Sequence, residues 1–520
     1  MTHARGARRT PPPPLVLARR RRRARRGLPV ALLAVAGLAL LVVAVGGVLA
    51  LTVERGRARA VRYRLERVAT ALRTRFAPPP RGTSALASGG GSVAMLNPPP
   101  LPRPDTIELR ISRMDRKGGG AAIVSTGVPL PPGALWPGQR RLVRVLVRGT
   151  EVPLYVEELA ARHRDGSLRA VLVQFTMPAL SYASPVSGAL VLGPESRPLA
   201  AVLPAALVRQ GARTALPQAA ALPADPAYLA HTDLMETTPE APLPSVAQVQ
   251  AMGGAFARYE ANFASYGDQH WANEGTTWGD DYYDRANIFY AWWVRTGNAE
   301  YWRRATLIAT TYRHDYLEVN NYASSPHWAQ LEGLEKHYLL TGDQASRFAV
   351  ARVAEGFAAG YMPMLGDTTW GWMDSRVQAR VLQAYFLAWR LGDAQGNTTQ
   401  DWAGLMDIGL TKVIGSQSAD GAFRFAQNCY YTQNFMTGLL TDQLIRQHTY
   451  YKADARIPVL VKKAVDYMWA TQWDAATQSF YYLGGQCDGQ GGKTPSPDLN
   501  GFTLPAFGWL YHETGDAHYR

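Results

Sequence analysis

The chain has 520 residues, 47% of them hydrophobic, and a formal net charge of +14. This length is sufficient for two or three domains with sizeable cores. Residues 1–76 hold 18 arginines against Glu54 and Glu66, so the rest of the chain carries 37 Lys and Arg against 39 Asp and Glu. Because the excess positive charge belongs to the amino-terminal tail, we expect no nucleic-acid partner.

An uncharged apolar run follows a basic tail (1–26). Residues 27–53 carry no charge and are long enough to cross a bilayer as a helix. Ten arginines precede the run, a bias that favours a cytoplasmic amino terminus. The sequence therefore predicts a single-pass membrane protein whose bulk is periplasmic or extracellular; a cleaved signal peptide is the alternative. Residues 54–105 are predicted to form a basic juxtamembrane helix and then a Pro/Gly-rich linker.

Over residues 106–205 the hydrophobic residues recur with a period of two. Ile107, Leu109 and Ile111 alternate with polar residues, and LVRVLV at 142–147 is strand-like. These patterns predict a small all-β domain. A Pro- and Ala-rich linker (206–245) is predicted to follow it.

Two stretches of this region resemble a known family. GVPLPPGAL at 127–135 and EVPLYVEELAARHRDGSLRAVLVQF at 151–175 are similar to the amino-terminal β domain of the rhamnogalacturonan exolyase/YetA-like proteins. The resemblance implies an accessory β domain and, for the whole protein, polysaccharide lyase activity.

A short hinge phrase recurs in the last part of the chain, as Thr296-Gly297-Asn298, Thr341-Gly342-Asp343, Leu391-Gly392-Asp393 and Thr514-Gly515-Asp516. Glycine ends a helix in the left-handed conformation, and the following Asn or Asp can cap the next helix. The phrases separate apolar helical patterns and so predict stacked helical hairpins. Helices are predicted at 246–264, 283–296, 298–313, 328–340, 343–360, 375–391, 399–415, 431–451, 454–471 and 500–514.

This alternation of inner and outer helices over 246–520 resembles the (α/α) toroid of six-hairpin glycosidases and several polysaccharide lyases. The predicted fold is therefore multidomain, with a transmembrane helix, a small all-β domain and an all-α (α/α) toroid. The resemblance implies a glycan-active protein whose site lies in the long loops before the inner helices, opposite the hinges.

Aromatic residues are concentrated in these loops and suit the apolar faces of sugar rings. Core packing is the alternative for each of them. The predicted substrate-binding aromatics are Trp271, Trp278, Trp328, Trp370, Trp372, Tyr430 and Tyr431.

Glycoside hydrolysis requires two carboxyl groups across the scissile bond. The catalytic candidates are Glu274, Asp280, Asp281, His327, Glu332 and Asp374. Helix capping is the alternative for the aspartates, as it is for Asp284, which could also pair with Arg285.

His270, Arg376 and Asn434 are further candidates for substrate binding. An inward-facing arginine could hold a substrate carboxylate, as a uronate lyase requires. Glu335 and Lys336 are expected on a solvated turn, whereas His337 and Tyr338 are expected to pack.

Cys429 and Cys487 could pair in an oxidising compartment or remain separately buried thiols. No metal site is predicted, because the chain has no further cysteine and no His-Glu-x-x-His helix. No cofactor is predicted either.

The predicted function is cleavage of a polysaccharide or oligosaccharide outside the cytoplasm. Residues 246–520 hold 21 basic and 27 acidic side chains, which favours a glycoside hydrolase acting on a neutral glycan. A β-eliminating lyase and a non-catalytic glycan-binding envelope protein are the alternatives.

Overall fold

The computed structural model describes residues 106–116, 118–193, 216–236, 243–278, 283–367, 369, 373–392, 400–426, 430–485 and 493–520. The predicted membrane span at 27–53 and the juxtamembrane segment lie outside these ranges. Among the helices of the described ranges, none has the length and apolar character that a membrane crossing requires.

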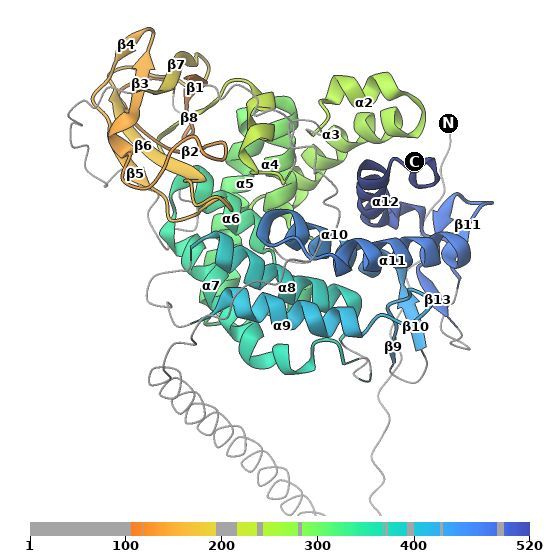
Figure 1. Ribbon diagram of the computed structural model, residues 1–520. Helices are drawn as coiled ribbons and strands as arrows, with labels where there is room; N and C mark the ends of the chain where they lie inside the picture. Colours follow the sequence, from red (N-terminus) through yellow and green to blue (C-terminus); the bar gives the residue numbers. More distant parts are fainter. Residues whose placement is uncertain are drawn as a thin grey trace, which may run out of the picture. The chain divides into compact units, whose positions relative to one another are not determined.

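The first part of the described chain is an eight-stranded sheet in the order β4-β3-β7-β1-β8-β2-β6-β5 (Figure 1). Neighbouring strands run antiparallel except β2 and β8, which pair in parallel. Its strands are β1 (Thr106–Arg113), β2 (Ala122–Pro129), β3 (Val143–Val147), β4 (Thr150–Glu151), β5 (Tyr155–Glu158), β6 (Ala170–Met177), β7 (Val186–Leu192) and β8 (Ala219–Pro223).

Alternating burial along β1 confirms the predicted period of two, with Ile107, Leu109 and Ile111 in the core of the sheet. Strand β8 lies within the segment predicted as a linker, 206–245, and pairs with β1. Part of that segment is therefore a central strand of the sheet.

The second part is helical. Its helices are α2 (Val246–Met252), α3 (Gly254–Glu274), α4 (Arg285–Thr296), α5 (Ala299–Tyr312), α6 (Leu331–Thr341), α7 (Gln344–Gly360), α8 (Ser375–Arg390), α9 (Trp402–Gly415), α10 (Asn434–Arg446), α11 (Arg456–Gln472) and α12 (Asn500–Thr514). Short strands also occur here: β9 (Phe425–Ala426), β10 (Tyr430–Gln433), β11 (Trp473–Asp474), β12 (Ser479–Phe480) and β13 (Leu483–Gly485).

The helices from α4 onward form successive hairpins. Helices α4, α6, α8, α10 and α12 contact one another in that order, and α5, α7, α9 and α11 pack outside them. All residues of α6 are buried, whereas α9 and α11 are buried on one face only. The predicted alternation of inner and outer helices is present in this part of the chain.

The hinge phrases take the predicted conformation. Gly297, Gly342 and Gly515 are left-handed, with φ of 66°, 75° and 68°. Asn298 and Asp343 accept backbone hydrogen bonds as amino-terminal caps of α5 and α7, as expected. Asp393 lies outside the described residues.

The amino-terminal helical segment differs from the prediction. Helix α3 continues to Glu274, so Gly267 to Glu274 form helix and not the predicted loop. The physical reason is that a single glycine in a helix interior costs only about 1 kcal/mol, which does not end a helix without a proline or a cap nearby.

The sheet packs on the hinge end of the helices, because β2 and β6 contact α6. A Cβ atom at Gly127 of β2 would lie 2.0 Å from the backbone oxygen of Leu339, so the strand approaches the helix backbone directly. At Gly392, a Cβ atom would lie 2.6 Å from the oxygen of Ala160. The long loops before α6 and α8 lie at the other end of these helices.

Candidate functional site

Three of the predicted polar residues come together at the entrances of two inner helices. Ser325 caps the short 3₁₀ turn η5 (Pro326–Trp328), and its hydroxyl lies 3.1 Å from Nδ1 of His327. Asp374 caps α8 by accepting a hydrogen bond from the Val377 amide at 2.9 Å. Nε2 of His327 lies 3.8 Å from the Asp374 carboxylate, which lies 3.8 Å from the Arg376 guanidinium.

The environment of His327 favours the neutral imidazole. Burial lowers the pKa of His327 below 6.5, and the charge of Arg376 lowers it further against the opposing effect of Asp374. A partly exposed, neutral imidazole beside a carboxylate can accept a proton at neutral pH.

Aromatic rings gather beside this cluster. Trp278 packs against Tyr316 with ring centroids 4.1 Å apart, and its edge contacts Tyr312 and Trp328 at 5.9 and 6.5 Å. Tyr316 lies on a π-helical segment, η4 (Arg313–Glu318), that continues α5. Trp278 and Trp328 are only half-buried, so parts of both rings remain accessible.

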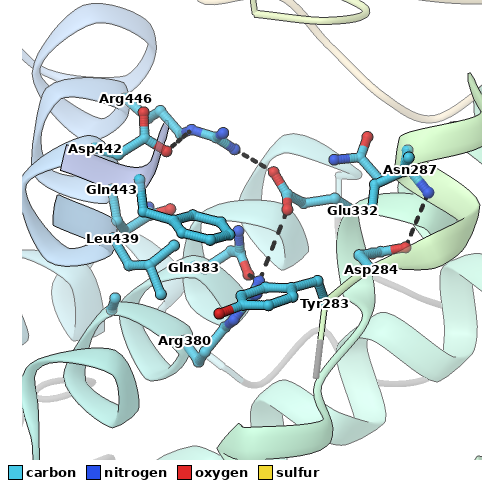
Figure 2. A pocket seen from close by; sticks show the side chains of 13 residues that line it. Tyr283, Asp284, Asn287, Glu332, Arg380, Gln383, Leu439, Asp442, Gln443 and Arg446 are labelled. Carbon is cyan, nitrogen blue, oxygen red and sulfur yellow. Dashed lines mark hydrogen bonds and ion pairs between the residues drawn. The ribbon is translucent and has the colours of Figure 1, made fainter. Parts of the chain in front are cut away.

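A cavity of about 270 Å³ lies among the inner helices (Figure 2). Side chains of α4, α6, α8, α10 and α12 and the residues just before α4 line it. These are Tyr283, Asp284, Asn287, Ile288, Glu332, Ala379, Arg380, Gln383, Leu439, Asp442, Gln443, Arg446 and Phe502.

Tyr283 forms part of the cavity wall. Its ring stacks on Phe502 with centroids 4.6 Å apart. Burial raises the pKa of the Tyr283 phenol, while the nearby charges of Arg376 and Arg380 oppose that rise. The phenol therefore stays protonated at neutral pH and lies within electrostatic reach of both arginines.

Two carboxyl groups of the cavity have pKa values moved in opposite directions. Burial and the charge of Glu332 raise the pKa of Asp284 to about 6. Burial would raise the pKa of Glu332, but the positive charges of Arg446, Lys336 and Arg380 outweigh it and lower the pKa to about 2. Asp284 caps α4 through Asn287 and accepts a second bond from the Gly333 amide at 2.7 Å, so of the roles left open for Asp284 by the sequence, helix capping is the one observed.

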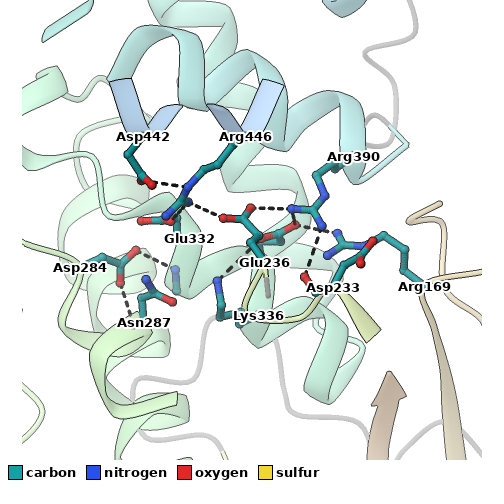
Figure 3. A network of polar contacts seen from close by, with 12 residues as sticks. Arg169, Asp233, Glu236, Asp284, Asn287, Glu332, Lys336, Arg390, Asp442 and Arg446 are labelled. Carbon is teal, nitrogen blue, oxygen red and sulfur yellow. Dashed lines mark hydrogen bonds and ion pairs between the residues drawn. The ribbon is translucent and has the colours of Figure 1, made fainter. Parts of the chain in front are cut away.

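A chain of buried ion pairs runs from the sheet to the cavity (Figure 3). Arg169, the residue just before β6, binds Glu335 of α6 at 2.6 Å. Glu236, which follows the sheet, binds Arg390 of α8 and Arg446 of α10, both at 2.6 Å. Arg446 also binds Glu332 and, at 3.0 Å, Asp442. The position of Glu332 in the cavity is therefore tied to residues contributed by the β region.

Glu335 and Lys336 were expected on a solvated turn, and this expectation is wrong. They are 0% and 2% exposed, because α6 is an inner helix whose residues are all buried and β2 and β6 pack against it. His337 and Tyr338 are buried, as predicted.

Glu332→Gln should make the free energy of unfolding less dependent on pH in the acidic range. The folded-state pKa of Glu332 is depressed from 4.5 to about 2, so its contribution is present above pH 4.5 and is lost as pH falls towards 2. The contribution is on the order of 3 kcal/mol at neutral pH. Urea unfolding of wild type and Glu332→Gln from pH 7 to pH 2 should show a difference that shrinks through this window; a constant difference would contradict the pairing.

Other predicted residues lie elsewhere. Glu274 and His270 are exposed on α3. Trp271, also on α3, packs edge-on against Phe289 at 6.2 Å under the guanidinium of Arg304. Asn434 is fully buried at the start of α10 and donates to the Tyr481 carbonyl at 2.7 Å. These four residues are not part of the cavity or of the His327 cluster.

Several predicted residues cannot be placed. The side chains of Tyr430 and Tyr431 lie outside the described part of the structure, although their backbones form β10. The remaining predicted residues Asp280, Asp281, Trp370, Trp372, Cys429 and Cys487 lie outside the described residues altogether. Within the described ranges, no group of three or more His, Cys, Asp or Glu side chains is arranged to hold a metal ion.

Sequence reasoning missed most of the cavity. Arg446 and Asp442 occupy the last turns of α10, far in sequence from the loops that hold the predicted site residues. Their spacing of four residues and opposite charges was a readable signal for a helical ion pair, but not for a cavity.

No protein-family model matches the chain, and no curated protein matches it. A solved polysaccharide lyase structure aligns with 78% of this chain at 10% sequence identity and a TM-score of 0.32. The alignment spans 65% of that lyase chain, less than two thirds of its length. A likeness at this level does not assign a function.

Proposed function

We propose that the protein cleaves a uronate-containing polysaccharide by β-elimination. The observation that carries the proposal is the neutral His327 held 3.8 Å from Asp374 with Arg376 beside the same carboxylate. A neutral base next to a guanidinium suits removal of a proton α to a substrate carboxylate. An unpaired acid–base carboxyl couple, which hydrolysis requires, is not found among Glu274, Glu332 and Asp374, because Glu332 is ion-paired and Glu274 is remote from the cavity.

Each group has a defined role in this reaction. Arg376 neutralises the substrate carboxylate, which makes the adjacent carbon more acidic. His327 removes the proton from that carbon. The electron pair forms a carbon–carbon double bond as the glycosidic oxygen leaves, and Tyr283 donates a proton to this oxygen. Trp278 and Trp328 offer aromatic faces to neighbouring sugar rings.

One observation favours hydrolysis as a second candidate. Asp284, with a pKa of about 6, and Glu332, with a pKa of about 2, line the same cavity. Carboxyl groups with pKa values driven apart are typical of acid–base pairs in glycosidases. Both oxygens of Asp284 already accept backbone hydrogen bonds, which makes a structural role the better account.

A panel of polysaccharides, with and without uronate, tests the proposal. Elimination creates an unsaturated product that absorbs in the ultraviolet, whereas hydrolysis creates reducing ends without that absorbance. We expect both signals to rise together on a uronate-containing polymer. Reducing ends without absorbance would support the hydrolase, and the absence of both signals on all polymers would leave binding without cleavage.

Activity should extend to lower pH than an ordinary imidazole permits. The base works only when His327 is unprotonated, and burial with Arg376 moves its pKa below 6.5. The rate should therefore hold steady as pH falls from 7.5 through 6.5 and decline only below that value. Initial rates from absorbance between pH 4.5 and 8 measure this profile. A decline centred above 6.5 would contradict the assignment of His327 as the base.

We further propose that the hairpins from α4 to α12 belong to an (α/α) toroid, on the ordered contacts of their inner helices. The apolar run at 27–53 supports a single-pass anchor with the enzyme outside the cytoplasm. Membrane fractionation and protease accessibility of the intact chain in cells test the anchor.

A further inference from the structure

One buried amide in the cavity has no partner. Gln443 of α10 lines the cavity and is 2% exposed. Neither its side-chain oxygen nor its nitrogen has a hydrogen-bond partner among the described residues. Buried polar groups are nearly always hydrogen-bonded, because an unmade bond at such a group lowers stability. An amide left in this state at a cavity wall is accounted for by a ligand that supplies both a donor and an acceptor.

A second polar side chain in the cavity wall also has an atom without a hydrogen-bond partner among the described residues. The side-chain oxygen of Asn287, on α4, also lacks a partner among the described residues. A hydroxyl group donates one hydrogen bond and accepts others, so one type of group serves the Gln443 nitrogen and oxygen and the Asn287 oxygen. Sugars carry such hydroxyls around a compact ring. The stacked pair Tyr283 and Phe502 supplies an apolar wall.

The charges of the cavity exclude an anionic ligand. Both arginines that line it are already compensated, since Arg380 lies 3.7 Å from Glu332 and Arg446 binds Glu332 and Asp442. A ligand carboxylate would enter beside three protein carboxyl groups, of Asp284, Glu332 and Asp442, and be repelled by those that are ionised.

We propose that the cavity is a subsite for one neutral sugar unit, held through its hydroxyl groups by Gln443 and Asn287. Its volume of about 270 Å³ is at the small end of ligand pockets, which suits a single ring and not a chain segment. The inference rests on the proposed function, to which it adds specificity. The substrate would be a polymer in which a neutral sugar adjoins the uronate bound at Arg376.

Binding of simple sugars to the whole protein tests the subsite. The probes are the methyl glycosides of glucose, galactose, mannose and rhamnose, compared with glucuronate and galacturonate, and binding is followed by saturation-transfer NMR titration. Gln443→Leu removes both hydrogen-bonding groups at similar volume. Gln447→Leu is the matched control, because Gln447 is a buried amide one turn after Gln443, directly after the end of α10, and does not line the cavity.

We expect at least one neutral glycoside to bind and Gln443→Leu to weaken its binding about tenfold, as the loss of two hydrogen bonds predicts. Gln447→Leu should leave the affinity unchanged. Since Gln443→Leu removes unpartnered polar atoms, its melting temperature should equal or exceed that of wild type. Asn287→Ala, with a less buried side chain, serves as a second variant if Gln443→Leu does not fold, and it should weaken binding several-fold.

Three results would overturn the subsite: no neutral glycoside binds, Gln443→Leu and Asn287→Ala bind as wild type does, or uronates bind more tightly than neutral sugars in a Gln443-dependent manner. Other results would overturn the proposed elimination without affecting the subsite, or the reverse. If neutral glycosides bind through Gln443 but no polymer yields an unsaturated product, the elimination is wrong and the subsite stands. If polymer is cleaved to that product and both variants bind and cleave as wild type does, the subsite alone is wrong.

Discussion

Replacing His327 by alanine is expected to lower the turnover number by about 10²- to 10⁴-fold, the usual contribution of a general base. The KM should change little, because Arg376 and the aromatic faces remain to bind the substrate. Initial rates of product absorbance on the polymer selected by the panel give both constants. Circular dichroism and melting temperature of the variant should match those of wild type, since the His327 side chain is 30% exposed.

His512→Ala is the control for this variant. His512 is exposed on α12, beside Glu513, and should have no effect on turnover. Turnover of His327→Ala within twofold of wild type would remove His327 from the reaction and with it the assignment of the site.

Arg169→Met is expected to lower the free energy of unfolding by about 3–5 kcal/mol, because it leaves the carboxylate of Glu335 buried without its closest partner. The side chains of Arg169 and Glu335 are each 1% exposed and lie 2.6 Å apart. Urea denaturation followed by circular dichroism measures the loss. The double variant Arg169→Met/Glu335→Leu should recover much of it, since both members of the ion pair are then removed together and Arg390 keeps Glu236.

Asp466→Asn is the control, because it breaks an ion pair that is exposed to solvent. Lys462 and Asp466 lie 2.6 Å apart on the solvent face of α11, and breaking their contact should cost less than about 1 kcal/mol. Equal losses in Arg169→Met and Asp466→Asn would show that burial does not amplify the Arg169–Glu335 pair.

The helices could be predicted from the sequence closely. Helix α12 spans the predicted 500–514, and α8 ends one residue before the predicted 391. The information is local in both cases: an apolar stripe with the helical period, and a hinge glycine whose conformation ends the helix. Strand β8 was missed because its sequence, AAALP, lacks the β-branched and aromatic residues that indicate strands. Its place between β1 and β2 is set by partners about a hundred residues away.

Only those parts of the candidate site that consist of residues close together in the sequence could be predicted. His327, Asp374 and Arg376 were separate candidates from two loops, and the structure brings them together because the entrances of α6 and α8 lie at one end of the array. The ion pairing of Glu332 could not be predicted. Its main partner, Arg446, is 114 positions away, so nothing near Glu332 indicates an ion pair in place of a free catalytic carboxyl.

The direct approach of Gly127 to the backbone of α6 bears on where the chain can be divided. The sheet is fixed to the helices by a contact that no larger residue permits, and Arg169 and Glu236 cross the same boundary to neutralise charges of α6, α8 and α10. A fragment beginning at residue 243 would expose the apolar side of α6 and leave Glu335 and Arg446 each short of a partner. The β region is therefore no detachable accessory, and the two parts should melt in a single cooperative transition.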